Sequence, residues 1–173
     1  MKPKSIIPSA NERILPPDRY ILSTTDRTGR ITSVNDLFVE YSGYTADELI
    51  GQQHNITRHP DMPRAVFWLA WDLLAAGEEF NGYVKNLCKD GSFYWVFSNI
   101  RPIISDSGEM TGYRSVRRHA RPQSVAKVAG LYAAMLAAET DAGPREAIQA
   151  GMTVLTGHLQ GQGMGYEAMV AKL

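Results

Sequence analysis

The stretch of sequence that decides the fold is FNGYVKNLCKDGSFYWVFSNIRPII, residues 80–104. Its centre is Asp90-Gly91, the strongest short hairpin signal in the chain, because this pair readily adopts the positive φ values of a tight turn. On both sides of the turn, residues 80–89 and 92–104 are rich in aromatic and β-branched residues, which favour strands. The stretch therefore predicts two antiparallel strands joined by a short turn.

Further strands are predicted on both sides of this hairpin. Downstream, the turn-forming residues 105–108 lead into another β-prone run, 110–116. Upstream, the short runs 20–25 and 30–34 surround Asp26-Arg27-Thr28-Gly29, which has the composition of a hairpin turn. Together with the central hairpin, these runs predict five antiparallel strands.

Helices are expected between the first two strands and the last three. Asn35 is a good N-cap for a short helix through residue 41, and Thr45-Ala46-Asp47-Glu48 forms a capping box for the next. The best helix candidate is 62–76, for which Asp61 is the expected N-cap. Helices beside an antiparallel sheet predict an α+β domain of about a hundred residues.

Composition changes at both ends of this region. Residues 1–17 contain four prolines and few large apolar side chains, which indicates an irregular N-terminal arm. Residues 122–173 are alanine-rich and helix-like, with a break at Gly143-Pro144 and a glycine- and glutamine-rich stretch before a last short helix. We therefore expect three parts: an arm, a central domain at 18–121 and a helical C-terminal extension.

The composition also excludes several classes of protein. The 173 residues carry 18 Lys+Arg against 18 Asp+Glu, and zero net charge argues against non-specific nucleic-acid binding. One cysteine excludes a disulfide framework and a multi-cysteine metal cluster, and no apolar run approaches the length of a membrane span, about 20 residues. No Walker loop, HExxH or other catalytic motif is present. These features predict a cytoplasmic protein that is not an enzyme.

Three blocks of the sequence resemble a known family. They are HNITRHPDMP at 54–63, GYVKN at 82–86 and KDGSFYWV at 89–96, together with Trp71. Smaller matches are STTD at 23–26, ND at 35–36, SGYT at 42–45 and GYRSVR at 112–117. The whole region, about residues 20–120, is similar to the N-terminal PAS domain of bacterial aerotaxis receptors. The resemblance implies the PAS fold, a five-stranded antiparallel sheet with flanking helices.

For function, the resemblance implies a sensor. Proteins of this kind bind FAD non-covalently and report redox or oxygen-linked energy state to the chemotaxis machinery. The cofactor-binding positions of the family fall here on Asn35, Arg58, His59, Asp61, Trp71 and Asn86. The receptors continue into a membrane anchor and a signalling coiled coil. Residues 122–173 resemble neither, so we expect the signal to pass by protein–protein contact. Expected partners are FAD, a second copy in a homodimer, and a chemoreceptor or other signalling protein.

Asn86 is supported by the strand pattern as well as by the resemblance. It alternates with the apolar residues Val84 and Cys88, which favours an inward side chain that can donate and accept at the edge of a flavin ring. A solvent-facing strand residue is the alternative. Cys88 lies on the hairpin and not in a helical Asn-Cys-Arg motif, which argues against flavin-adduct photochemistry.

The other candidate residues each have a structural interpretation beside the functional one. Arg58 has the fork that suits phosphate or carboxylate, but it also fits a surface arginine paired with Asp61. His59 suits a cofactor or a loop carbonyl, and Asp61 suits a helix cap that acts only indirectly on the cofactor. Trp71 suits stacking on an aromatic ring of the cofactor or burial in the core.

The last predicted strand and its exit are basic. Residues 113–121 contain Arg114, Arg117, Arg118 and Arg121 and no acid, although the chain as a whole has zero net charge. This run is either a solvated strand edge or a docking surface for an acidic partner.

Two alternatives keep the PAS fold and change its use. A haem-binding oxygen sensor would use His59 or His54 as its iron ligand. A cofactor-free dimerisation or interaction module would leave Arg58 and Trp71 with structural roles. The histidines and Cys88 match no standard metal-site spacing, so no metal site is predicted.

Overall fold

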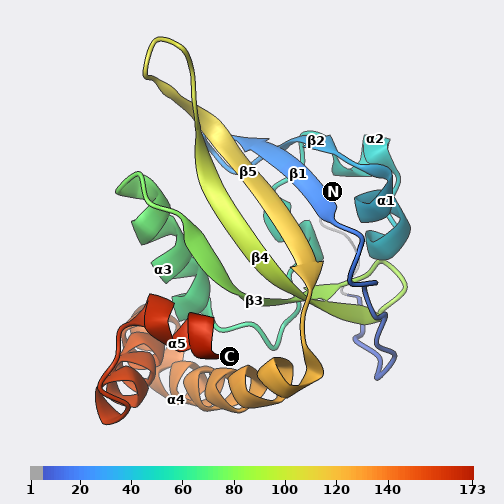
Figure 1. Cartoon of the computed structure of the whole chain (residues 1–173). Helices are drawn as coiled ribbons and strands as arrows, with labels where there is room; N and C mark the ends of the chain where they lie inside the picture. The colour runs from blue at the N-terminus through green and yellow to red at the C-terminus, as the bar shows by residue number, and fades with distance from the viewer. Residues whose placement is uncertain (1–5) are drawn as a thin grey trace. The chain divides into compact units, whose positions relative to one another are not determined.

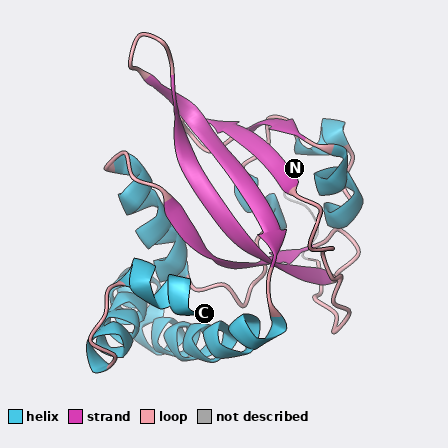
Figure 2. Cartoon of the chain, in the orientation of Figure 1, coloured by secondary structure: helices cyan, strands magenta, loops and turns pink. Residues whose placement is uncertain are grey.

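A computed structural model describes residues 6–173 and has the expected α+β architecture (Figure 1, Figure 2). Five strands form one antiparallel sheet in the order β2-β1-β5-β4-β3. They are β1 Ile21–Asp26, β2 Ile31–Val34, β3 Phe80–Leu87, β4 Phe93–Ile104 and β5 Met110–His119. The prediction of a five-stranded antiparallel sheet with flanking helices is confirmed.

The chain divides into two compact units. The first combines the described residues up to His59 with residues 77–120, and the second combines residues 60–76 with 121–173. The first unit holds the sheet, the helices α1 Asp36–Ser42 and α2 Ala46–Leu49, and the 3₁₀ helix η1 His54–Thr57. The second unit holds the helices α3 Arg64–Ala75, α4 Pro122–Gly161 and α5 Tyr166–Lys172. Residues 60–76 thus group with the C-terminal helices, and the domain boundaries expected from the sequence stay a prediction.

The central hairpin is built as its turn sequence indicates. Its loop has three residues, Lys89 to Gly91, because the Cys88 N–H donates to the Ser92 carbonyl at 2.7 Å and the Gly91 N–H donates back to Cys88 at 3.0 Å. Gly91 has φ +88°, the left-handed conformation that closes a three-residue hairpin loop. The predicted turn at Asp90-Gly91 is confirmed.

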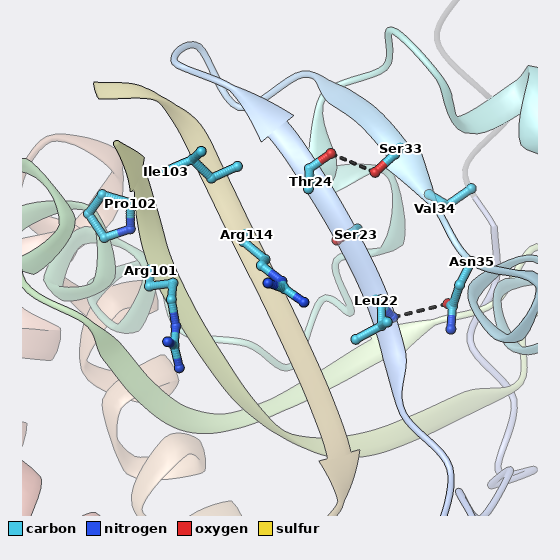
Figure 3. Close-up of a pocket in the computed structure, with 10 residues that line it drawn as sticks. All are labelled: Leu22, Ser23, Thr24, Ser33, Val34, Asn35, Arg101, Pro102, Ile103 and Arg114. Carbon is cyan, nitrogen blue, oxygen red and sulfur yellow. Dashed lines mark hydrogen bonds between the residues drawn. The ribbon is translucent and has the colours of Figure 1, made fainter. Parts of the chain in front are cut away.

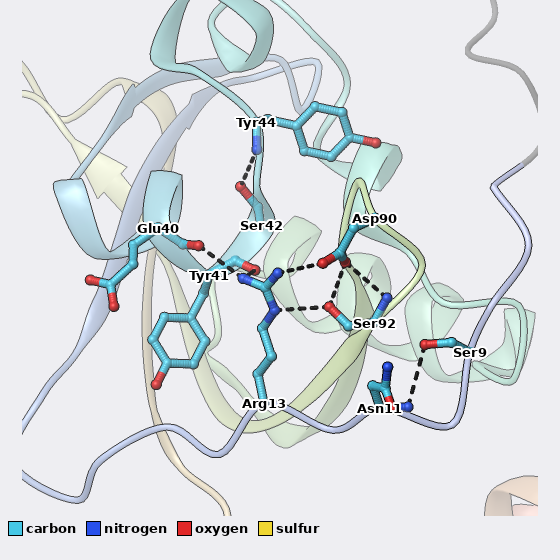
Figure 4. A network of polar contacts seen from close by, with 9 residues as sticks. All are labelled: Ser9, Asn11, Arg13, Glu40, Tyr41, Ser42, Tyr44, Asp90 and Ser92. Carbon is cyan, nitrogen blue, oxygen red and sulfur yellow. Dashed lines mark hydrogen bonds and ion pairs between the residues drawn. The ribbon is translucent and has the colours of Figure 1, made fainter.

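The N-terminal arm is irregular but is tied to the start of β4 (Figure 4). The Phe93 N–H donates to the Asn11 carbonyl at 2.9 Å, and the Arg13 N–H donates to the Phe93 carbonyl at 2.7 Å. The Arg13 side chain donates to Ser92 Oγ at 2.8 Å and pairs with Asp90 at 2.6 Å. Hydrogen bonds from Ser92, with the nearby Arg13 charge, lower the pKa of Asp90 to about 2. Residues 1–5 of the expected arm lie outside the described residues.

The two short helices carry the caps that the sequence predicts. Asn35 Oδ1 accepts from the Phe38 N–H at 3.2 Å, and Gly43 ends α1 in the left-handed conformation with φ +73°. Thr45 and Glu48 make both hydrogen bonds of the capping box at α2. These caps satisfy backbone groups that a helix end would otherwise leave without partners.

Asp61 does not cap α3, so that prediction is wrong. The helix begins at Arg64, and its N-cap residue is Pro63, which has no side-chain acceptor. Glu139 of α4 takes that role instead, accepting from the Arg64 and Ala65 N–H groups at 2.8 Å each. The positive end of the α3 dipole stabilises this buried carboxylate. The cap was not predictable locally because its acceptor lies far along the chain.

The predicted break in the long C-terminal helical region is confirmed. Gly143 has φ +76° and ψ 173°, which interrupts α4 immediately before Pro144. After the break, Gly151 lies so close to Glu139 that an added Cβ would be 2.5 Å from its Oε1 and 2.8 Å from the Ala65 Cβ. Over residues 6–173, no helix combines the length and the apolar character needed to cross a bilayer.

Candidate functional site

One face of the sheet, here called the inner face, is covered by α1, α2 and η1 of the same unit. Side chains alternate between the two faces along each strand. Six of the buried inward side chains are polar: Ser23, Thr25, Asn86, Ser98, Ser115 and Arg117. A covered sheet face is normally apolar, because buried polar groups need hydrogen-bond partners. This face therefore has the chemistry of a binding site for a polar ligand.

Arg117 is the most unusual of these side chains. It is 3% exposed, and no described carboxylate forms an ion pair with it. Its Nη2 donates to Ser23 Oγ at 3.0 Å and to His54 Nε2 at 2.5 Å, and the guanidinium lies 5.0 Å from the centre of the Phe38 ring. Burial lowers the pKa of Arg117 to about 10, so the group stays charged at neutral pH. A buried cation without a counter-charge is typical of a functional site.

His54 holds this arginine in place as a neutral acceptor. Because Arg117 donates to Nε2, the proton of the imidazole belongs on Nδ1. Burial, together with the adjacent charge of Arg117, lowers the pKa of His54 to about 3. The ring also stacks on Phe38, with 5.7 Å between ring centres. His54 therefore orients the guanidinium and adds no charge of its own.

Several buried polar atoms of the inner face have no hydrogen-bond partner among residues 6–173. They are Thr25 Oγ1, Asn86 Nδ2, Tyr94 Oη and Arg117 Nη1. Burial also raises the pKa of Tyr94, which keeps its hydroxyl protonated and able to donate. Each buried polar group without a partner costs about 1–3 kcal/mol. A polar ligand, or ordered water in its place, would remove that cost.

Asn86 faces the same side of the sheet as Tyr94, because the two are directly opposite in the β3–β4 pair. Asn86 is buried, and its Oδ1 accepts from Thr57 Oγ1 at 3.4 Å. Arg58 follows η1, and its backbone forms an isolated antiparallel bridge with Asn86. The structure therefore brings Arg58 and Asn86 together at one edge of the sheet, with the Asn86 amide directed inward as the strand pattern predicts.

His59 lies directly after this bridge and is 2% exposed. Its ring meets Phe93 edge to face, with 5.8 Å between ring centres. The contact fixes the ring against the first residue of β4. His59 is thus part of the same edge of the sheet as Arg58 and Asn86.

Asn35 is placed differently from these three residues. Its Oδ1 accepts from both Phe38 and Leu22, and its Nδ2 donates to the Tyr20 carbonyl at 2.9 Å. These three bonds connect the start of α1 to β1 and occupy the side-chain amide. The arrangement supports an indirect role for Asn35, in which it positions α1 over the inner face.

Asp61 and Trp71 belong to the second unit. Asp61 is exposed and precedes the start of α3, whereas Trp71 lies within α3. Trp71 is 46% exposed and Trp68, one turn earlier on the helix, is 44% exposed. The interpretation of Trp71 as a residue buried in the core is therefore wrong, because nearly half of its surface is accessible to solvent.

Three residues of the inner face, Arg117, Tyr94 and Ser23, were not predicted as site residues from the sequence. Arg117 was grouped with the outward arginines Arg114 and Arg118 in the basic run, although the three do not share a face. The period of two along β5 separates Arg117 from the other two, and this signal was present in the sequence. Tyr94 and Ser23 carry no comparable signal, because a strand tyrosine or serine is ordinary on either face.

Comparisons with known proteins agree with this architecture. A model of the PAS fold matches residues 31–117. The aerotaxis receptor of Escherichia coli K12 is 44% identical over 142 residues, which are 82% of this chain and 27% of that receptor. The biofilm dispersion protein of Pseudomonas aeruginosa is 28% identical over 91 residues, which are 49% of this chain and 21% of that protein. The chain thus spans about a quarter of the length of these relatives.

Among solved structures, a light-oxygen-voltage domain studied with a flavin analogue has a similar fold. It superposes with a TM-score of 0.56 at 19% identity, covering 64% of this chain and 84% of that one. At this level of identity, the likeness concerns the fold alone.

Proposed function

The chain belongs to the PAS family, and we propose that it is a sensor that binds FAD non-covalently at the inner face of the sheet. In this proposal it signals redox or oxygen-linked energy state in aerotaxis or chemotaxis by protein–protein contact. The observation that carries the proposal is the group of buried donors that have no partner within the described residues 6–173, namely Asn86 Nδ2, Tyr94 Oη and Arg117 Nη1. The resemblance to the aerotaxis receptor of Escherichia coli, a receptor by name, supports the sensory part.

The residues present fit a flavin. Its ring system is flat, with carbonyl oxygens and ring nitrogens along one edge, and the inner face supplies hydrogen-bond donors for such an edge. Asn86 can donate through Nδ2, while its Oδ1 stays with Thr57. Arg117 can donate through Nη1, while its Nη2 stays with Ser23 and His54. When bound, the flavin supplies reversible electron acceptance.

The charge of Arg117 gives the site a means of distinguishing redox states. A buried guanidinium stabilises negative charge in its neighbourhood more strongly than an exposed one, because the surroundings screen it less. A difference of about 1.4 kcal/mol between two states corresponds to about 30 mV for a two-electron couple. One altered hydrogen bond at Asn86 or Arg117 is of that size. We infer that such a change biases the sheet and is read by the partner.

The two alternatives explain less of the structure. In the haem hypothesis, His54 Nε2 would first have to give up its hydrogen bond from Arg117 Nη2, which is 2.5 Å long, before it could bind iron. In a cofactor-free module, the buried donors of the inner face would have no ligand to bind. We propose that the chain acts without catalysis, in the cytoplasm and as a homodimer that contacts a chemoreceptor. One of its relatives is named as a receptor.

An absorption spectrum of the purified full chain tests the proposal. We expect flavin bands near ~450 nm, and FAD rather than FMN in the supernatant after heat release, as separated by chromatography. A Soret band near ~400 nm, or no chromophore even after incubation with FAD, would contradict it. As a second readout, hydrogen exchange in β3 should differ between oxidised and dithionite-reduced protein, and identical exchange would reject the signalling role of Asn86.

A further inference from the structure

The outer face of the same sheet carries a row of polar side chains that the flavin proposal does not use. Ser33, Thr24, Arg114 and Arg101 are successive cross-strand partners on β2, β1, β5 and β4 (Figure 3). Figure 3 shows the Arg101 and Arg114 side chains extending in the same direction over the sheet. The two guanidinium groups therefore form a cationic pair on an exposed surface.

The positive charges of this pair are only partly compensated by nearby acidic groups. Like charges directly opposite each other on a sheet are destabilising. Arg101 is partly compensated, because it donates to Asn99 Oδ1 at 3.0 Å and lies 3.6 Å from a carboxylate oxygen of Glu79. The Arg114 side chain has no hydrogen bond or ion pair with any residue from 6 to 173. One positive charge of the pair is thus available to a negative group from outside.

The row lies in a groove of about 590 Å³. Apolar side chains line it beside the arginines, among them Leu22, Val34 and Ile103. The Thr24 hydroxyl is 2.6 Å from Ser33 Oγ, which adds polar groups at the far side of the row. The groove therefore combines cations, hydroxyls and apolar surface within the width of four strands.

We propose that this groove docks an acidic segment of a partner protein, with a carboxylate seated on the Arg101–Arg114 pair. The proposal rests on the proposed function, since it names the chemistry of the signalling partner. Guanidinium groups match carboxylates in geometry, and Glu79 already places one beside Arg101. The neighbouring apolar surface suits aliphatic residues that alternate with acidic ones along an extended segment.

A protein segment suits the groove better than a nucleic acid does. The groove offers two arginines and no aromatic platform on which bases could stack. The chain has zero net charge, so it lacks the extended basic field that neutralises many phosphates. Because the arginines are exposed, the docking contact should weaken with salt.

The test measures binding of a fluorescein-labelled hexapeptide of alternating glutamate and valine to the full chain by fluorescence anisotropy. The double variant Arg101→Ala/Arg114→Ala should weaken binding by about tenfold or more. Glu79→Gln removes the internal competitor and should tighten binding by about threefold. Arg145→Ala, which removes an exposed arginine from α4, is the matched control and should leave affinity unchanged.

Equal affinity of the wild type and the double variant would overturn the proposal, as would equal binding of a lysine–valine peptide. Binding of inorganic phosphate or of a DNA oligonucleotide in place of the glutamate peptide would also reject an acidic protein segment as the occupant. An absorption spectrum of each sample separates this test from the flavin proposal. A flavin-loaded chain that does not bind the peptide refutes only the docking groove, and a flavin-free chain that binds it refutes only the sensor.

Discussion

Arg117 and Arg114 lie three residues apart on β5, and the two faces of the sheet give them opposite surroundings. Arg117 is buried, with Ser23 and His54 as its acceptors, and its Nη1 has no partner in the described part of the chain. Arg114 is exposed in a groove beside a second arginine. Desolvation makes the inward cation costly, whereas the outward one costs little. We infer that the inward position serves a ligand inside the domain and the outward position serves a partner outside it.

The largest expected effect tests the neutral state of His54 beside Arg117. The pKa of His54 is about 3 in the folded protein, against an ordinary value of 6.5. The unfolded chain therefore binds more protons between pH 6.5 and pH 3, and stability is lost as pH falls through this window. Relative to His54→Gln, which keeps an acceptor but does not titrate, the wild type should lose about 2–3 kcal/mol between pH 6.5 and 4.5.

Urea unfolding at a series of pH values measures this difference. Wild type and His54→Gln share all other titrating groups, so only the difference between their slopes counts. Parallel pH profiles would show that His54 is not held neutral by Arg117.

The second prediction compares the two arginines directly. Arg117→Met should lower the affinity for FAD by about ten- to a hundredfold, because it removes a charged donor from the inner face. It should not lower the stability of the flavin-free protein, since Ser23 can donate to His54 Nε2 and a buried charge is gone. Arg114→Met, the control on the opposite face, should bind FAD normally. Flavin titration and thermal unfolding of the flavin-free forms provide both readouts, and equal FAD affinity in the two variants would remove Arg117 from the site.

The third prediction makes the same comparison on β3. Asn86→Ala should weaken FAD binding by about tenfold, because Asn86 directs its amide to the inner face. Asn81→Ala is the matched control, since Asn81 accepts from Asn99 on the outer face of the same strand pair. Flavin absorbance per protein after purification checks both. Full flavin occupancy in Asn86→Ala would exclude the proposed contact.

The smallest effect concerns the outer face. Arg114→Gln removes one of two opposed like charges, so it should raise the free energy of unfolding by about 0.5 kcal/mol at low salt. The gain should shrink as salt screens the pair. Denaturant unfolding at low and high ionic strength measures it. A loss of stability at low salt would mean that Arg114 has a stabilising partner and is not available for docking.

Most of the local structure was predictable from the sequence because its causes are local. The Asp90-Gly91 turn, the Asn35 cap and the capping box at Thr45 depend on residues within a few positions of each other. The break at Gly143-Pro144 has the same character. The inward direction of Asn86 followed from the period of two along β3, and the same period would have separated Arg117 from Arg114.

The sequence by itself determined the elements, their order and the PAS resemblance, because propensity, turn chemistry and motif spacing are properties of neighbouring residues. Only the tertiary structure decided which distant groups meet. Glu139 caps α3 in place of Asp61, Arg13 ties the arm to the central hairpin, and Arg117 finds its acceptors on β1 and η1. These contacts depend on how segments far apart in the chain pack, and a buried hydrogen bond between them leaves no periodic trace in the sequence.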